Sequence, residues 1–159
     1  MRWLLLFCLL LSGLGLAKTE EIRLFQPADR TFRVFVPGNP RSISQDSNKF
    51  LWGVDDGRTS YVFGYTVLPR AAGMEEEDLR AGLGQYATGY LRNAQVREKS
   101  RTPVKVGAHV GLDVRGTASY GDSWVRILAV GPRIYVLASD GTTEAETTRY
   151  WTSFKLLSN

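Results

Sequence analysis

The chain has very few of the residues that carry most enzyme chemistry. Its 159 residues include one cysteine, Cys8, and one histidine, His109. A lone cysteine forms no disulfide within the chain, and these two residues cannot build the multi-cysteine or multi-histidine sites that hold zinc. The remaining composition, 43% hydrophobic and 23% charged, is that of a folded globular protein, and the length suits one domain.

The first 17 residues have the pattern of a secretory signal. Arg2 supplies a positive start, the apolar run Trp3–Leu11 follows, and Gly15 and Ala17 occupy the small-residue positions before a cleavage site. The run is too short to span a bilayer, which takes about 20 apolar residues. We therefore expect residues 1–17 to be a signal peptide, with cleavage after Ala17, and the protein to be exported, either to the periplasm or outside the cell.

Two alternatives to this processing stay open. Cys8 could become a lipidated N-terminus, although only Trp3 to Phe7 would then precede it as an apolar segment. The leader could also remain attached as an anchor. Cleavage after Ala17 would leave residues 18–159, without any cysteine and with the net charge lowered from +4 to +3 by loss of Arg2. Thiol catalysis and disulfide redox chemistry are excluded for such a chain.

Alternation of apolar and polar residues predicts several strands in residues 18–159. Asp56-Gly57 indicates a hairpin with a type I′ turn, and Gly131-Pro132 a second hairpin. Residues 42–48 are polar and are expected to form a loop. Gly107 and Gly111 are positions where the longest of the strands could bend or break. The predicted strands are Thr31–Val36, Lys49–Val54, Thr59–Leu68, Val104–Ser119, Ser123–Val130 and Arg133–Ser139.

Two helices are expected between and after these strands. The first covers about Glu75–Val96, and the second begins at the capping box formed by Thr143 and Glu146 and runs towards Trp151. The order of elements predicts one α+β domain, residues 18–159, in which an antiparallel sheet of six to seven strands packs against a central and a short C-terminal helix, an α/β/α sandwich. The expected buried stripe of the first helix is Leu79, Leu83, Tyr86, Tyr90 and Ala94.

Several segments together resemble the PsbP-like group of α/β/α sandwiches. They are the Phe-x-Val-x-Val-Pro-Gly segment at 32–38, the Gly-x-x-x-Gly strand at 107–111, the Gly-Pro-Arg-Ile-Tyr-Val-Leu strand at 131–137 and the terminal Trp-x-x-Ser-Phe-Lys-Leu at 151–157. The resemblance covers about residues 22–157 and implies this fold together with a non-enzymatic accessory or binding role. It transfers no site residue, because its motifs consist of packing and turn residues.

The candidates for catalysis are few. His109 and Asp113 share the polar face of one predicted strand, but four residues along a strand separate them by about 13 Å. None of the serines Ser119, Ser123 and Ser139 lies in Gly-x-Ser-x-Gly. The carboxylates are explained by turns and a helix start, and no calcium loop, phosphate loop or dinucleotide fingerprint is present. The sequence therefore predicts no catalytic residue, metal or cofactor.

Two groups of residues remain as candidates for binding. Basic residues gather after the first helix, where they could contact an anionic surface or an acidic protein, or could complement the helix dipole. Aromatic residues are spread over the strands and the last helix, where they could line a ligand pocket; alternating positions favour the core. The basic cluster is Arg92, Arg97, Lys99, Arg101 and Lys105; the aromatic residues are Trp52, Tyr61, Tyr65, Trp124, Tyr135 and Trp151.

These observations predict an exported, non-catalytic accessory or binding module of the cell envelope. Its partner is an unknown protein or envelope component, with no nucleic acid and no membrane span after cleavage. The alternative is a carrier of a small apolar ligand in a pocket between sheet and helix. A hydrolase using His109 ranks behind both, because the strand geometry provides no triad.

Overall fold

The computed structural model describes residues 21–157. The predicted signal peptide, residues 1–17, lies outside them, so cleavage and export stay predictions. The main element is a seven-stranded sheet in which every neighbouring pair is antiparallel. Its strands, in spatial order, are β3 (Arg41–Gln45), β4 (Lys49–Asp55), β5 (Ser60–Val67), β9 (Arg133–Asp140), β8 (Gly121–Val130), β7 (His109–Ala118) and β6 (Arg97–Val106).

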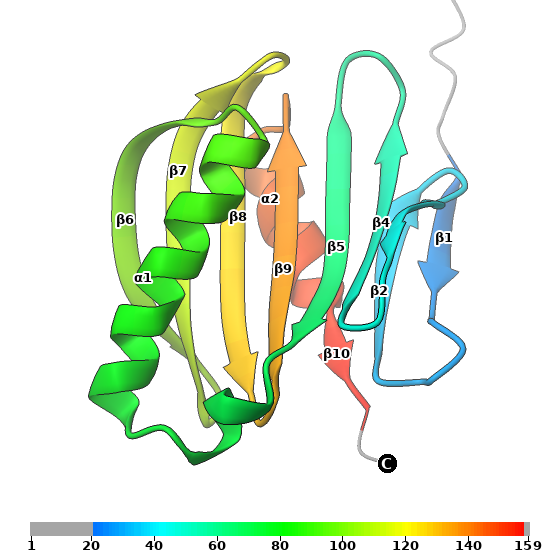
Figure 1. Cartoon of the computed structure of the whole chain (residues 1–159). Helices are drawn as coiled ribbons and strands as arrows, with labels where there is room; N and C mark the ends of the chain where they lie inside the picture. The colour runs from blue at the N-terminus through cyan, green and yellow to red at the C-terminus, as the bar shows by residue number, and fades with distance from the viewer. Residues whose placement is uncertain (1–20, 158–159) are drawn as a thin grey trace, which may run out of the picture.

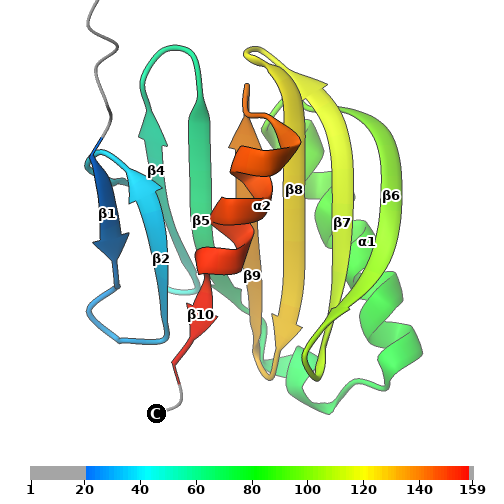
Figure 2. The ribbon, with the colours of Figure 1, turned by 180° about the vertical axis from the view of Figure 1, so that it is seen from behind.

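Different elements cover the two faces of this sheet (Figures 1 and 2). Helix α1 (Glu76–Asn93), preceded by the short 3-10 helix η1 (Pro69–Gly73), packs on one face. Helix α2 (Glu144–Ser153) lies on the other face, beside a three-stranded antiparallel sheet. That small sheet contains β1 (Ile22–Phe25), β2 (Phe32–Pro37) and β10 (Lys155–Leu156). The predicted α+β class, with its antiparallel sheet and two helices, is confirmed.

Side-chain alternation on the central strands builds two apolar cores. On β9, Ile134 and Val136 pack towards α1, whereas Tyr135 and Leu137 pack towards β2 and α2. Both sets are at most 3% exposed, so β9 is buried on both faces. The second core is rich in aromatic contacts; Phe32 of the small sheet meets Tyr135 edge-on at 5.9 Å between ring centres.

Several predicted strand limits were wrong. The strand expected over Val104–Ser119 is two strands, β6 and β7, joined by a turn at Gly107 and Ala108. Strand β6 begins at Arg97, because pairing with β7 gives its polar N-terminal half the hydrogen bonds that a loop would lack. The expected loop at 42–48 mostly forms edge strand β3 for the same reason. The short strands β1 and β10 were not predicted.

The hairpin between β4 and β5 is confirmed, but its turn is not type I′. That turn needs positive φ at both central residues, and here Gly57 has φ 84° while Asp56 does not. Instead, the Asp56 carboxylate accepts hydrogen bonds from the backbone N–H groups of Arg58 and Thr59 at 2.8 and 2.7 Å. The side chain thus organises a longer loop, as aspartate does in Asx turns.

Helix α1 ends earlier than predicted. Beyond Asn93 the chain forms a Schellman motif. The Val96 N–H donates to the Leu91 carbonyl and the Gln95 N–H donates to the Arg92 carbonyl. Gln95 adopts the left-handed conformation, with φ 55°. Ala94 is therefore exposed instead of closing the buried stripe. The fully packed positions of α1 are Leu83, Ala87 and Leu91, with Leu79, Tyr86 and Tyr90 partly buried beside them.

Candidate functional site

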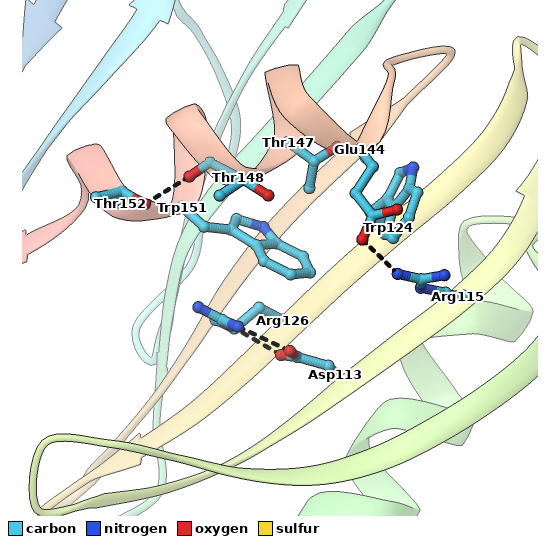
Figure 3. Close-up of a pocket in the computed structure, with 9 residues that line it drawn as sticks. All are labelled: Asp113, Arg115, Trp124, Arg126, Glu144, Thr147, Thr148, Trp151 and Thr152. Carbon is cyan, nitrogen blue, oxygen red and sulfur yellow. Dashed lines mark hydrogen bonds and ion pairs between the residues drawn. The ribbon is translucent and has the colours of Figure 1, made fainter.

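A hollow of about 260 Å³ lies between α2 and strands β7 and β8, on the sheet face opposite α1 (Figure 3). It is slightly smaller than the roughly 300–1,000 Å³ of small-molecule pockets, and therefore suits one side chain or one functional group of a larger partner. Its lining combines two tryptophans, two arginines, two carboxylates and three threonines: Asp113, Arg115, Trp124, Arg126, Glu144, Thr147, Thr148, Trp151 and Thr152.

Strand register assembles the sheet side of the hollow. In the antiparallel pairing of β7 with β8, Asp113 lies directly across from Arg126, and Arg115 directly across from Trp124. Residues two apart on a strand point to the same face. All four side chains therefore project towards α2, while their strand neighbours Val114 and Val125 fill the core under α1.

Helix α2 provides the opposite wall. Glu144, Thr148 and Trp151 are four and three residues apart and therefore share one side of the helix. Trp151 Nε1 donates to the Leu137 carbonyl of β9 at 3.2 Å, which fixes the indole ring. The predicted capping box is confirmed: Thr143 Oγ1 accepts from Glu146 N–H, and the Glu146 carboxylate accepts from Thr143 N–H.

The hydroxyl groups of three buried residues attach the start of α2 to β9. Thr142 Oγ1 lies 2.9 Å from Ser139 Oγ and 2.8 Å from Thr147 Oγ1. Ser139 and Thr147 are also 3.0 Å apart. The three hydroxyls satisfy one another, so their burial carries no penalty for unmade hydrogen bonds. This cluster holds the helix wall of the hollow against the sheet.

Arg126 is the most constrained charged group of the hollow. Its Nε and Nη2 atoms donate to the two carboxylate oxygens of Asp113 at 2.8 and 2.7 Å, a bidentate pair. Its Cζ atom lies 4.2 Å from the centre of the Trp151 ring. Both charged side chains are only about one-fifth exposed (22% and 21%), so solvent screens this pair less than a surface pair.

Arg115 makes a similar but looser arrangement. Its Cζ atom lies 4.2 Å from the Trp124 ring centre, and its Nη2 donates to Glu144 at 2.8 Å. This ion pair is more than half exposed, so it contributes little stability and is easily exchanged for another partner. The Trp124 Nε1 is buried and has no hydrogen-bond partner among residues 21–157. The hollow therefore offers two flat guanidinium groups already held on indole rings.

The structure places His109 and Asp113 on one strand, β7, and brings them into no hydrogen bond with each other in the described chain. The Asp113 carboxylate is occupied by Arg126 instead. Among the other acids, burial and the charge of Asp55 raise the pKa of Asp140, which lies on β9 across from Ser123. Residues 21–157 contain no group of three His, Cys, Asp or Glu side chains that could hold a metal ion.

Most of the predicted basic cluster lies on β6 and not at the end of the helix. Lys99 pairs with Asp122, Arg101 with Glu98, and Lys105 with Glu76. Lys105 and then Arg80 lower the pKa of Glu76 by hydrogen bonding. In the part of the chain that the structure describes, Arg92 and Arg97 form no ion pair. Partner binding by this cluster stays a prediction.

The basic residues on β6 also have a structural explanation. Strand β6 is an edge of the seven-stranded sheet, with Pro103 in it and a register shift between Glu98 and Ser100. Charged side chains, proline and bulges protect exposed edges against pairing with other chains. These residues therefore keep β6 from acting as an open edge, whether or not they also bind a partner.

The aromatic residues divide between core and hollow. Tyr61, Tyr65 and Tyr135 are at most 9% exposed in the core shared with the small sheet, as predicted. The Tyr65 hydroxyl donates to Asp29, and burial followed by this contact raises the pKa of Tyr65. Trp124, 9% exposed, and Trp151, which packs against the same core, also line the hollow. These two tryptophans therefore belong to the core, as expected, and to the hollow as well.

A second hollow, of about 570 Å³, lies between η1 and α1 and is lined by residues that include Leu68, Met74, Leu79 and Tyr86. Ile134 of β9 and Leu83 of α1 also line it, so it reaches the edge of the core between helix and sheet. None of the helices within residues 21–157 is long and apolar enough to cross a membrane.

Solved structures share this architecture. Cyanobacterial PsbP (CyanoP) from Synechocystis aligns with a TM-score of 0.61 at 7% identity, over 92% of this chain and 99% of that one. The Ran-binding protein Mog1p from Saccharomyces cerevisiae aligns at 0.50 and 8% identity, over 87% and 96%. A protein from Bacteroides thetaiotaomicron aligns at 0.51 and 12% identity, over 86% of this chain and 49% of that one, about half its length.

The chain therefore has a PsbP-like fold, and the resemblance found in the sequence is confirmed at the level of fold. At these identities the likeness says nothing about what the chain binds. No protein-family model and no curated protein matches the sequence.

Sequence reasoning missed the hollow because it depends on strand register. The alternating residues Asp113 and Arg115, and Trp124 and Arg126, were visible as polar or aromatic positions of two strands. Only the pairing of β7 with β8 brings Asp113 to Arg126. The signal that could have indicated the hollow is the pair Trp124 and Arg126, two residues apart on one strand and so on the same face. An arginine from the neighbouring strand can stack on such a tryptophan if the strand register places the two side by side.

Proposed function

We propose that the chain is an exported, non-catalytic accessory module, a single domain of residues 18–159, that binds a protein partner in the hollow between α2 and β7–β8. The observation that carries the proposal is the pair of guanidinium groups, each 4.2 Å from a tryptophan ring centre and each held by a carboxylate. Arginine and tryptophan are enriched at the residues that dominate binding energy in protein interfaces.

The chemistry of the hollow supports recognition over catalysis. It contains neither histidine nor cysteine, and its two carboxylates, Asp113 and Glu144, are already paired with arginine. Side chains held in place before binding lose little freedom on association, which favours affinity. Arg115 can exchange Glu144 for a carboxylate of the partner, and the volume suits a single side chain. An acidic side chain of a protein partner therefore fits best.

Site-specific photo-crosslinking tests this proposal. A photoreactive amino acid at Thr148, which is exposed on the wall of the hollow, should crosslink to one partner protein in the native host, and the same group at exposed Ser47 should not. Adding Arg126→Gln or Arg115→Gln to the Thr148 probe should reduce the product at least about tenfold. Equal products from both probe positions, or products insensitive to both arginine variants, would contradict the proposal.

A second candidate function is supported by the hollow between η1 and α1. Its volume of about 570 Å³ falls within the usual range for small-molecule pockets, and Leu68, Met74 and Tyr86 give it apolar walls. A carrier of a small apolar ligand would use this site. Native mass spectrometry after gentle purification should then show extra mass that Gly82→Phe, which fills the hollow, removes. A mass equal to the bare chain would count against the carrier.

A further inference from the structure

Three large apolar side chains lie in the open on the outer face of the three-stranded sheet. Ile22 is 62% exposed, Leu24 is 51% exposed and Phe35 is 49% exposed. Leu24 and Phe35 are directly paired across β1 and β2, and Ile22 is two residues from Leu24 on the same face. Their inward-facing neighbours Phe25 and Val34 belong to the core. The outer face is therefore apolar at its centre although the strand pattern would allow polar residues there.

Two cations continue this face. Arg33 lies two residues before Phe35 on β2 and is paired directly with Lys155 on β10. Both are exposed, and neither forms an ion pair within residues 21–157. Like charges directly opposite each other on adjacent strands are destabilising, so an anion bound between them would relieve this repulsion. We call Ile22, Leu24, Arg33, Phe35 and Lys155 the outer patch.

The composition of the outer patch matches a lipid surface better than a protein. It contains lysine, which is depleted from protein interfaces, and neither of its two cations is neutralised by an ion pair within residues 21–157. Apolar residues such as leucine and phenylalanine, flanked by lysine and arginine, are the combination by which peripheral elements enter the head-group region of anionic membranes. Lysine and arginine near the surface add electrostatic attraction to anionic lipids.

In a chain that keeps its leader, the position of the patch along the sequence supports the same occupant. Ile22 is the first residue of the first strand, and ten residues separate it from the apolar run Trp3–Leu11. Ten residues reach at most about 35 Å. If that run stays in a bilayer, the outer patch is held within reach of the same membrane. The patch is complete in a chain beginning at Lys18 as well, so the inference does not require a retained leader.

We propose that the outer patch docks on a membrane surface containing anionic lipids, with Ile22, Leu24 and Phe35 among the head groups and Arg33 and Lys155 on the lipid phosphates. The small sheet and α2 lie side by side on the same face of the main sheet (Figure 2). The inference does not depend on the hollow or on its protein partner.

Vesicle co-sedimentation tests the proposal with protein recovered from the exporting host. The protein should bind vesicles of phosphatidylcholine with phosphatidylglycerol, bind pure phosphatidylcholine more weakly, and lose binding with added salt. Arg33→Gln with Lys155→Gln should lower the partition coefficient about thirtyfold. Leu24→Ser with Phe35→Ser should lower it at least about tenfold. Circular dichroism checks that each variant is folded, and the charge pair tests the proposal even if the apolar pair unfolds.

Matched controls use exposed residues elsewhere. Ile43→Ser, at a side chain 56% exposed on β3, and Arg41→Gln with Arg58→Gln should leave vesicle binding unchanged. Arg126→Gln should also leave it unchanged, which separates failure here from failure of the proposed partner site. Absence of vesicle binding would overturn the proposal, as would equal binding by wild type and both patch variants. A dimer that dissociates in the Leu24→Ser with Phe35→Ser variant would assign the patch to a second copy of the chain. That result would also overturn the membrane proposal.

Discussion

The guanidinium carbon of Arg126 lies 4.2 Å from the centre of the Trp151 ring, and two nitrogens of the same group are held by Asp113. One side chain thus joins β7, β8 and α2. Only arginine combines a flat face that stacks on an aromatic ring with a fork that meets both oxygens of a carboxylate. The contact both stabilises the position of α2 and forms the floor of the hollow.

Removing this contact should cost stability. Arg126→Gln should lower the free energy of unfolding by about 1–3 kcal/mol, because it removes the stack and leaves Asp113 without its partner in a site only about one-fifth exposed. Arg115→Gln is the matched control and should lower it by only about 0.5–1 kcal/mol, since it removes an exposed stack on Trp124 and an ion pair open to solvent. Urea denaturation measures both, and equal losses would contradict the distinction.

The capping box of α2 should make stability depend on pH. Thr143, through its N–H and then its hydroxyl, lowers the pKa of Glu146. Its pKa in the folded state is thus below that of the unfolded chain, so its contribution is complete above the unfolded value of about 4.3 and is lost as the pH falls through the folded value. The stability difference between wild type and Glu146→Gln should shrink in that acidic window. Thr143→Ala should cost about 1 kcal/mol at neutral pH.

Gln95 should be replaceable with a gain in stability. It ends α1 in the left-handed region, with φ 55°, where a Cβ atom costs about 1 kcal/mol. Gln95→Gly should raise the free energy of unfolding by about that amount, as measured by urea denaturation. Ala94→Gly, at φ −82°, has no strain to relieve and should give no gain. A similar gain at both positions would show that the Schellman geometry is not the cause.

Gly64 should be irreplaceable. It has φ 145°, and a Cβ atom there would lie 2.0 Å from the Phe50 carbonyl oxygen of the neighbouring strand. Gly64→Ala should therefore cost at least about 3 kcal/mol or prevent folding. Gly89 in α1 has no atom within 4 Å of such a Cβ, and Gly89→Ala should stabilise the protein by about 1 kcal/mol. Thermal unfolding compares the two, and a tolerated Gly64→Ala would contradict the close strand approach.

Asp140 should destabilise the fold at neutral pH. Burial, with the charge of Asp55, raises its pKa and outweighs the opposing effect of the Ser123 hydroxyl. Because the folded-state pKa is above the unfolded value of about 3.9, stability falls as the pH rises between the two values. Asp140→Asn should therefore unfold at higher urea than wild type near neutral pH. The advantage should vanish below about pH 4, and an advantage independent of pH would contradict this cause.

Local signals predicted the elements whose conformation depends on nearby residues. The capping box of Thr143 and Glu146, the turn at Gly131 and the periodic stripe of Leu79 and Leu83 are readable because hydrogen bonds and burial there involve neighbours along the chain. The limits of β6 and the identity of β3 were not readable. Most of their residues are polar, and only pairing with β7 and β4 makes them strands.

The sequence by itself determined the fold class, the order of the main strands and helices, and the scarcity of catalytic side chains. Tertiary structure alone decided which side chains meet. Asp113 reaches Arg126 through strand register, and Arg126 reaches Trp151 through the seating of α2 on the sheet. It also left Ile22 and Phe35 on an outer face instead of in the core. Alternating side-chain polarity along a strand shows that its two faces differ, but the layer packed against each face decides which face is buried.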